Sequence, residues 1–410
     1  MSSQRESQAD IEPTPGGVGS LDQVVAEWPA TSGRWGAQGR AHALPYVPGV
    51  LTSAELVETA ESIASVQLDN GMIPWFPGGH ADAWNHVEAA MALAVCGLFP
   101  EAERAYEWLA ASQHQKDRFG AAQASLEGFE GSWYAYYLAE GIEDPRRETN
   151  MCAYVATGVW HHYCLTQDSG FLDEMWPVVD RAINFVLRWQ QSDGTILWSV
   201  DEHGSPGDHA LLTGSSSICH SLRCALALAE VLGTERPKWE WAAAQLSHAV
   251  AFHPERFAPK DEFAMDWYYP VLAGSLSGES ARARLSAGWA TYVMEGVGVR
   301  CVSDQPWVTA AETAECVLAL DGAGLVEEAY ELMAKVQLLR CEDGSYWTGL
   351  VFPDQIAFPF EERSTYTAGA MILAAHALSG AGPAAGLFRG EGLPSLGEIQ
   401  DMTLACNAHT

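Results

Sequence analysis

The sequence predicts an all-α protein folded as an (α/α)6 barrel, in which six outer and six inner helices alternate along the chain. Three observations predict it: helix-length segments come in pairs, a turn motif recurs, and short links between segments alternate with long ones. A chain of 410 residues, 48% of them hydrophobic, can bury one large core. A barrel or repeat architecture lets a chain of this length form a single domain.

The expected helices fall into six pairs. The first helix of a pair is amphipathic, and the second is rich in small apolar residues, as in Ala89–Val95 and Ala370–Ala375. Because a helix that is apolar all round is a buried one, the second helices should form the inner ring. The expected ranges are 52–67 with 82–98, 101–114 with 148–166, 168–190 with 210–232, 236–252 with 264–277, 279–293 with 308–322, and 324–340 with 363–379.

A turn motif follows several outer helices. It consists of a Gln, then Asp-Gly or Asn-Gly, then an aromatic residue. Clear copies are Gln67–Trp75, Gln190–Trp198 and Gln337–Trp347, and Gln113–Gly120 is a degenerate copy. The glycine supplies a positive-φ turn after the helix. The spacing of the copies fits multiples of a unit of roughly 55–60 residues, which indicates a repeat architecture.

The ends of the chain are expected to lie outside the barrel. Residues 1–20 are polar and predict a disordered tail, and 21–48 predict an N-terminal arm packed on the domain. Thr52-Ser-Ala-Glu55 is a capping box that opens the first helix of a barrel spanning 49–380, which leaves 381–410 as a C-terminal tail.

Composition excludes several classes of partner. A net charge of -31 repels nucleic acid and anionic membranes, and no basic cluster is present to hold a polyphosphate. No secretory signal and no run of 18 apolar residues is visible, and the 9 Cys read as buried free thiols, so a cytoplasmic protein without a membrane span is expected. Cys219, His220 and Cys224 are interpreted as packing residues, so no metal and no cofactor is expected. The expected partner is a small-molecule substrate, either a sugar or an isoprenoid.

Loop lengths predict where a functional site lies. The links from inner to outer helices are short, whereas those from outer to inner helices are long. Long loops in a compact domain tend to be functional. All the long links fall at the end where the inner helices begin, so a cavity along the barrel axis should open there. The long links are 68–81, 115–147, 191–209, 253–263, 294–307 and 341–362.

Acidic and large aromatic residues gather at these same helix starts, most densely in Phe263–Pro270 and Arg300–Glu312. The candidate catalytic residues are Asp266, Glu88, Asp82, Asp304, Glu312 and Glu361. The candidate substrate-binding residues are Trp75, Trp84, His86, Asn150, Tyr154, Trp267, Tyr268, Tyr269, Trp307 and Trp347.

Several of these carboxylates also have a structural interpretation. Asp82 and Asp304 stand where helix N-caps belong, and Thr309-Ala-Ala-Glu312 matches a capping box. Glu88 and Asp266 lie early in apolar helices, where a carboxylate needs a partner, and this favours a functional role. A protonated carboxylic acid and a carboxylate beside Trp rings suit glycoside chemistry.

The turn motifs Gln67–Trp75, Gln190–Trp198 and Gln337–Trp347 resemble the repeats of the squalene cyclase and protein prenyltransferase superfamily, and the chain resembles bacterial prenyltransferase-like proteins. That resemblance implies an isoprenoid enzyme. The sequence departs from it in having no Asp-x-Asp-Asp motif, no basic cluster for a diphosphate and no Asp/Cys/His zinc set.

A second resemblance is to the six-hairpin glycosidases, which are similar to glucoamylase-type enzymes and sugar epimerases. Asp82–Glu88 and Phe358–Glu362 look like the mouth motifs of that family. It implies a carbohydrate-active enzyme, and an inverting hydrolase of a small glycoside or glycoconjugate is the leading expectation. The alternatives are an isoprenoid enzyme and a binding protein on the same barrel.

Overall fold

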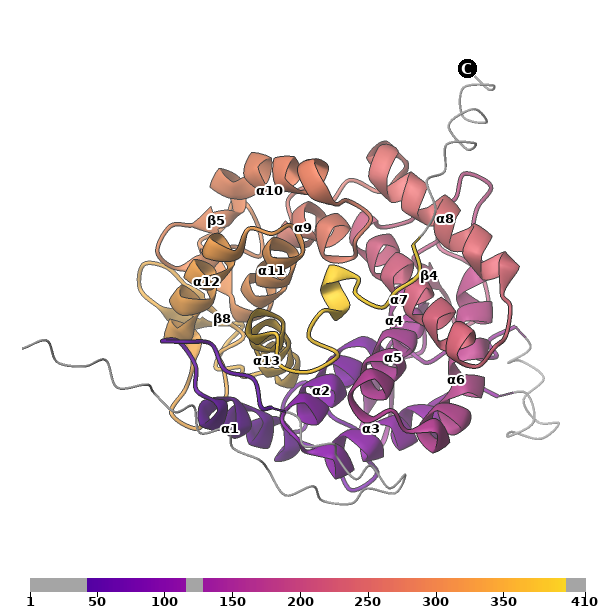
Figure 1. Cartoon of the computed structure of the whole chain (residues 1–410), viewed down its shortest axis with the longest axis horizontal. Coiled ribbons are helices and arrows are strands. Elements are labelled where there is room, and N and C mark those ends of the chain that lie inside the picture. The colour runs from indigo at the N-terminus through magenta and orange to yellow at the C-terminus, as the bar shows by residue number, and fades with distance from the viewer. Residues whose placement is uncertain (1–42, 116–127, 396–410) are drawn as a thin grey trace, which may run out of the picture.

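The protein is a closed double ring of helices. The computed structural model describes residues 43–115 and 128–395, so the expected tail over 1–20 and most of the expected arm over 21–48 lie outside the described residues. Figure 1 shows the helices of the described chain arranged as an inner ring within an outer ring. This confirms the predicted all-α (α/α)6 barrel.

The outer ring consists of α1 (Ser53–Ala64), α3 (Phe99–Ser112), α6 (Ser169–Leu187), α8 (Pro237–Phe252), α10 (Gly278–Tyr292) and α12 (Val326–Lys335). The inner ring consists of α2 (Ala83–Val95), α4 (Thr149–Ala153) with α5 (Val155–Thr166), α7 (Leu212–Val231), α9 (Ala264–Leu272), α11 (Ala310–Gly322) and α13 (Thr365–Ser379). Most predicted bounds agree within a few residues. The predicted helix over 148–166 is broken at Tyr154, and the one predicted over 264–277 ends at Leu272.

Small residues let the inner helices pack closely. A Cβ on Gly158 of α5 would lie 2.5 Å from Cγ1 of Val87 on α2, so only glycine fits there. Each inner helix contacts its inner neighbours in turn, and α13 packs on both α1 and α2, which closes the ring. The apolar core therefore lies between the two rings and around the axis.

The recurring turn ties successive outer helices together. The side-chain amide of Gln67 donates to the carbonyl of Gly71 at 3.1 Å and to that of Glu101 on α3 at 2.9 Å. Gln190 repeats this arrangement with Gly194 and with Ala242 on α8. The glycines of these turns have positive φ, as predicted. The motif is thus part of the scaffold.

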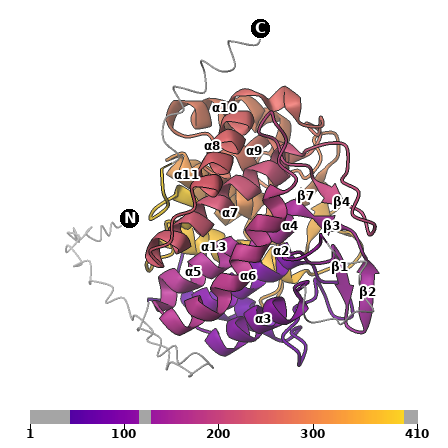
Figure 2. The ribbon, with the colours of Figure 1, turned by 90° about the vertical axis from the view of Figure 1, so that its right-hand side faces the viewer.

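Short antiparallel strands occupy several of the long links. They are β1 (Tyr136–Leu138) with β2 (Gly141–Asp144), β3 (Arg147–Glu148) with β4 (Ser199–Val200), β5 (Val293–Met294) with β6 (Gly298–Val299), and a sheet of β7 (Trp307–Thr309), β8 (Gly349–Val351) and β9 (Ile356–Phe358). Figure 2 shows β1, β2, β3, β4 and β7 gathered at one end of the helices. This end, where the inner helices begin, is called the mouth below.

The described part of the expected C-terminal tail packs on the barrel. Residues 381–395, yellow in Figure 1, cross the ring and include η4 (Leu387–Arg389). Figure 2 shows this segment at the end opposite the mouth. Phe388 stacks on His220 of α7 with ring centroids 5.3 Å apart. Arg389 forms an ion pair with Asp321 of α11 at 2.7 Å. This segment therefore covers the closed end of the barrel.

Candidate active site

Glu88 is a buried carboxyl group in the second turn of α2, with 6% of its surface exposed. Its Oε1 atom accepts hydrogen bonds from the Tyr154 hydroxyl at 3.0 Å and from the Trp84 indole at 3.2 Å. Burial raises the pKa of Glu88 to about 7, although both hydrogen bonds oppose the rise. Glu88 can therefore hold a proton near neutral pH.

Glu315 of α11 is a second buried carboxyl group in the same region. Its two oxygens accept from the hydroxyls of Tyr268 and Tyr269 on α9, the latter at 2.6 Å. Burial, and next the charge of Glu88, raise the pKa of Glu315 well above its usual range. Trp84, which bonds to Glu88, packs edge-on against Tyr269, which bonds to Glu315, with ring centroids 5.8 Å apart. The two carboxyl groups are therefore linked through a pair of aromatic rings.

Glu312 lies one turn before Glu315 and is half-buried. Thr309 is the N-cap of α11, but its side chain makes no capping hydrogen bond, so the predicted capping box is not formed. Burial raises the pKa of Glu312. The charges of Glu312 and Asp82 both raise the pKa of Tyr366 on α13, after burial as the main cause. Both carboxyl groups are therefore close enough to Tyr366 to affect its pKa.

Asp82 is the N-cap of α2, as its structural interpretation predicted. Its Oδ1 accepts from the backbone N–H groups of Trp84 and Asn85 at 2.8 and 3.0 Å. Its Oδ2 accepts from the Trp75 indole at 2.7 Å and from the Asn85 side chain at 2.8 Å. Burial is complete and raises the pKa of Asp82 despite these donors. Asp82 therefore anchors both the start of α2 and Trp75.

Glu148, at the end of β3, is a further buried carboxyl group that the sequence analysis did not single out. Its Oε2 accepts from the Trp198 indole at 3.0 Å. Burial raises the pKa of Glu148 to about 7, and the charge of Asp82 adds to the rise. Two simple signals mark these missed residues: Glu148 directly precedes an inner helix, and Glu315 follows Glu312 by one helical turn.

The carboxyl groups described so far are called the axial cluster below; they are those of Glu88, Glu315, Glu312, Asp82 and Glu148. Three predicted residues are placed outside this cluster. Both ring nitrogens of His86 are bonded to backbone groups, those of Ile73 at 3.1 Å and Ala105 at 2.9 Å, so His86 ties α2 to its surroundings. Asp304 is exposed in the link before β7 and is not the cap of α11. Glu361 is exposed, because its position in the link after β9 directs it to solvent.

Asp266 and Trp267 also lie outside the cluster, although they belong to the first turn of α9. Asp266 accepts from the backbone N–H and the hydroxyl of Thr213, at 3.2 and 2.6 Å, and so caps the start of α7. The Trp267 indole donates to the carbonyl of Arg284 at 2.9 Å on α10. Both side chains thus engage neighbouring helices.

The remaining predicted aromatics and Asn150 lie at the mouth. Trp75 packs edge-on against Tyr366 at 4.9 Å. Trp307 stacks on Phe358 at 4.5 Å, and Trp347 lies beneath the guanidinium group of Arg363 at 5.6 Å. Asn150 is buried at the start of α4, and its Oδ1 has no hydrogen-bond partner within 43–115 and 128–395. An unpaired buried acceptor of this kind can serve a ligand.

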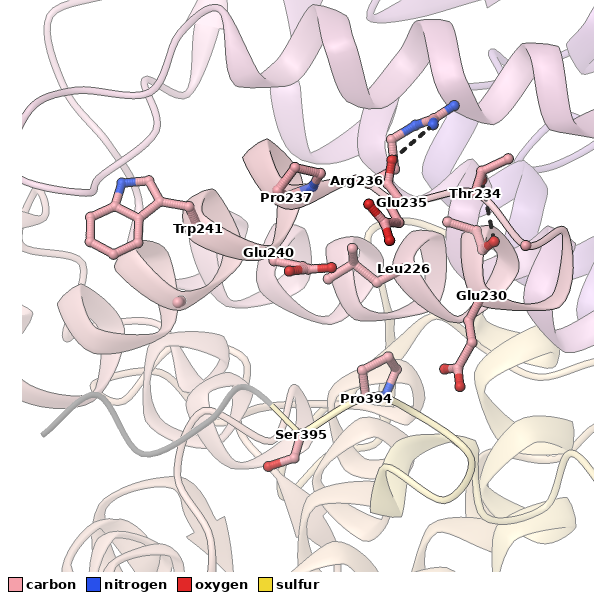
Figure 3. Close-up of a pocket in the computed structure, with 13 residues that line it drawn as sticks. Leu226, Glu230, Thr234, Glu235, Arg236, Pro237, Glu240, Trp241, Pro394 and Ser395 are labelled. Atoms are coloured by element: carbon pink, nitrogen blue, oxygen red, sulfur yellow. Dashed lines mark hydrogen bonds between the residues drawn. The ribbon is translucent and has the colours of Figure 1, made fainter. Parts of the chain in front are cut away.

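A separate pocket of about 720 Å³ lies near the closed end, shown in Figure 3. It is formed by the end of α7, the start of α8 and the segment at Pro394. Glu230, Glu240 and Trp241 line it, and it contains none of the axial carboxyl groups.

The arrangement at the mouth suits acid–base chemistry on a polar ligand with apolar faces, because carboxyl groups of raised pKa stand among aromatic rings. In the part of the chain that the structure describes, no group of three or more His, Cys, Asp or Glu is placed to hold a metal ion. No described helix is long and apolar enough to span a bilayer.

No family model matches the sequence. The chain is 50% identical over 352 residues to the MMP endo-(1,4)-3-O-methyl-alpha-D-mannosidase of Mycolicibacterium hassiacum, covering 86% of this chain and 94% of that protein. It is 26% identical over 192 residues to the kojibiose hydrolase of Mucilaginibacter mallensis, a match that covers 42% of this chain and 26% of that protein.

Solved structures show the same fold at low sequence identity. A glycosidase superposes with a TM-score of 0.62 at 16% identity, covering 80% of this chain and 97% of its own. A D-mannose isomerase superposes with a TM-score of 0.56 at 9% identity, and the match covers 79% of this chain and 95% of the isomerase. A sugar epimerase from a ruminal bacterium superposes with a TM-score of 0.56 at 12% identity, and the match covers 82% of this chain and 98% of the epimerase. At these identities the likeness concerns the fold alone.

Proposed function

The chain belongs to the glycoside hydrolase family of the MMP endo-(1,4)-3-O-methyl-alpha-D-mannosidase, and from this premise we propose that it cleaves α-1,4 bonds within chains of 3-O-methyl-D-mannose. The observation that carries the proposal is the 50% identity over 94% of that relative. Family membership also decides among the three functions expected from the sequence, because it favours carbohydrate hydrolysis over isoprenoid chemistry and over binding alone.

Glu88 is the proposed proton donor. A general acid must be protonated at the working pH and must reach the leaving oxygen. With a pKa of about 7, Glu88 is protonated in a large fraction of molecules at neutral pH. Its hydrogen bonds to Tyr154 and Trp84 both use Oε1, which leaves Oε2 to act on the glycosidic oxygen.

Glu312 is the proposed base that activates water. It is half-buried, unlike Glu88 and Glu315, and it lies in the first turn of α11, where the helix N-terminus favours the charged form. α13 stands between α2 and α11 in the ring, so Glu88 and Glu312 belong to helices that have another inner helix between them. Such separation leaves room for a water molecule beneath the sugar, which supports an inverting mechanism.

The aromatic residues are proposed to hold the sugar units. Trp84 and Tyr154 pack together at 5.4 Å beside Glu88. Trp75 and Tyr366 form a second pair at the start of α13. Aromatic rings pack on the apolar faces of sugar rings, and they equally accommodate the O-methyl group that distinguishes the relative's substrate.

The test of activity is incubation of the protein with oligosaccharides of α-1,4-linked 3-O-methylmannose, with products sized by mass spectrometry. Internal cleavage gives several shorter oligosaccharides early in the reaction. Proton NMR of the first product gives the β-anomer if the mechanism is inverting. Absence of cleavage of these chains, or release of single terminal sugars only, would overturn the proposal.

The two roles are separated by Glu88→Gln and Glu312→Gln. Loss of a proton donor is tolerated on an aryl glycoside whose leaving group needs no proton, whereas loss of the base is not. Added azide should restore turnover to Glu312→Gln by replacing the activated water. Glu148→Gln tests the second candidate donor, because the pKa of Glu148 is also about 7. Glu61→Gln, on the exposed side of α1, is the matched control.

A further inference from the structure

A pocket of about 580 Å³ lies between the link over 253–263, the first turn of α9 and the end of α10. Leu212, Phe257, Asp266, Trp267, Arg284 and Tyr292 are among the residues that line it. None of the axial carboxyl groups does so. The pocket is therefore distinct from the candidate active site.

The first turn of α9 separates the two sites. Asp266 bonds to α7 through Thr213, and Trp267 bonds to α10 through Arg284. The next two residues, Tyr268 and Tyr269, bond to Glu315 of the axial cluster. Four consecutive residues thus form a wall with the pocket on one side and the axial cluster on the other.

The residues that line the pocket include one acceptor, Asp266, and one donor, Arg284. The hydrogen bonds from Thr213 use only Oδ1 of Asp266. Arg284 donates from Nε and Nη2 to the carbonyls of Trp267 and Asp266, at 2.8 and 2.7 Å. Among the described residues, Oδ2 of Asp266 and Nη1 of Arg284 carry no hydrogen bond. A carboxylate oxygen and a guanidinium N–H that line one pocket can bind hydroxyl groups of one ligand, the first as acceptor and the second as donor.

The rest of the wall is apolar and well supported. Trp267 is 5% exposed and stacks on Tyr292 with centroids 5.2 Å apart. A Cβ on Gly288 would lie 2.3 Å from the Trp267 Nε1 atom, so α10 carries a glycine where the ring lies against it. A rigid apolar wall with a few fixed polar groups is typical of small-ligand sites.

The charges that line the pocket are mixed. Lys260 and Arg284 stand among Glu255, Asp261 and Asp266. A mixed lining favours a neutral ligand over an anion or a cation. The pocket is built from the starts of α7 and α9 and one of the long links, so it opens at the mouth end.

From these observations we propose that the Asp266 pocket is a second sugar site, which holds a remote neutral unit of the polysaccharide cleaved at the axis. This inference rests on the proposed function and deepens it, because an enzyme that cuts inside a chain gains from holding that chain at two places. A second contact of this kind increases the efficiency on long chains but adds nothing for substrates too short to reach it.

The decisive variant is Ala287→Phe, which fills the pocket from an exposed position on α10 that lines it. Its matched control is Ala283→Phe, exposed one turn earlier on the same helix and outside the pocket lining. We expect the ratio of kcat/KM for long chains to that for trisaccharides to fall roughly tenfold in Ala287→Phe, the loss that corresponds to two hydrogen bonds. Ala283→Phe should keep the wild-type ratio. Equal ratios in all three proteins would overturn the second site.

Calorimetric titration with long chains gives an independent measurement in the background of Glu88→Gln, which removes the proposed proton donor. Asp266→Asn keeps an acceptor for Thr213 but loses the charge, and it should weaken binding of long chains roughly threefold to tenfold. A melting temperature matching the parent shows that the barrel is intact; unchanged affinity in an intact Asp266→Asn protein refutes the site. Failure of the wild-type enzyme to cleave any 3-O-methylmannoside refutes the proposed function instead, and calorimetry of the wild type against Ala287→Phe then still decides the pocket.

Discussion

Tyr154 donates its hydroxyl hydrogen to Oε1 of Glu88 over 3.0 Å, and it does so from the break between α4 and α5. The break is the one major departure from the helix predicted over 148–166. Tyr154 is both the C-cap residue of α4 and the N-cap residue of α5. The interruption of the inner helix therefore coincides with the tyrosine that contacts the proposed proton donor.

Tyr154→Phe should shift the pH dependence of activity. The Tyr154 hydrogen bond favours the charged form of Glu88 and lowers its pKa, so removing the bond raises that pKa above 7. If Glu88 acts as the acid, the basic limb of kcat/KM moves up by roughly 0.5–1 pH unit. Tyr163→Phe on the same helix should leave the limb in place. If the basic limb of the kcat/KM profile does not move in Tyr154→Phe, a group other than Glu88 donates the proton.

Glu88→Gln should alter how stability depends on pH. The pKa of Glu88 rises from 4.5 to about 7 on folding, so the native state keeps a proton that the unfolded state has lost between these pH values. The resulting stabilisation is complete below pH 4.5 and is lost as pH rises through 7. Relative to wild type, Glu88→Gln should therefore gain about 3 kcal/mol in free energy of unfolding between pH 4 and pH 8. Denaturant titrations at both pH values, with Glu61→Gln as control, measure this gain, and a constant difference would contradict it.

Phe388→Ala should destabilise the closed end of the barrel. Phe388 is 8% exposed and stacks on His220, so truncation removes a buried ring and leaves a cavity. We expect a loss of about 3 kcal/mol in the free energy of unfolding, measured in urea. Phe360 is 91% exposed, and the same substitution there should change stability by less than about 0.5 kcal/mol. A loss below about 0.5 kcal/mol for Phe388→Ala as well would show that this contact does not stabilise the ring.

Gly288→Ala tests the close approach of Trp267 to α10. Alanine is favoured over glycine in a helix by about 1 kcal/mol, but here the added Cβ would lie 2.3 Å from the indole. Overpacking costs about 1–3 kcal/mol, so the net effect should be a loss of stability. At Gly322 of α11 a Cβ would be 3.5 Å from the nearest atom, the carbonyl oxygen of Phe388. Gly322→Ala should therefore be neutral or stabilising. Thermal melting of both variants and of the wild type measures the difference.

The ring of helices was predictable because its pattern is local. Inner helices buried on all sides need small apolar residues such as those in Ala89–Val95, and these are visible without any knowledge of the partners. The Gln-Gly turns were predictable because positive φ selects glycine, as at Gly71 and Gly194. Fold class and most helix bounds follow from such features.

The site was predictable only in outline, because it depends on which way each side chain points. Asp266 and Glu88 look alike in the sequence, yet Asp266 caps α7 and Glu88 faces Tyr154. Glu361 is exposed, while its neighbour Glu362 accepts a hydrogen bond from Thr348 at 3.0 Å. Differences of one residue or one turn of register depend on contacts between distant segments, which a single sequence does not specify.

Closure of the ring has a consequence for synthesis. α13 packs on α1 and α2, and the hydroxyl of Thr365 donates to the carbonyl of Pro74, a residue 291 positions earlier. The sides of α1 and α2 that face α13 therefore stay uncovered on a growing chain until its last inner helix has left the ribosome. Contacts of such long sequence separation form slowly, and exposed apolar surface in the meantime invites aggregation. Before α13 is synthesised, the chain can form only an open arc of helical hairpins, and chaperones should bind this incomplete form. The ring closes once α13 packs on α1 and α2.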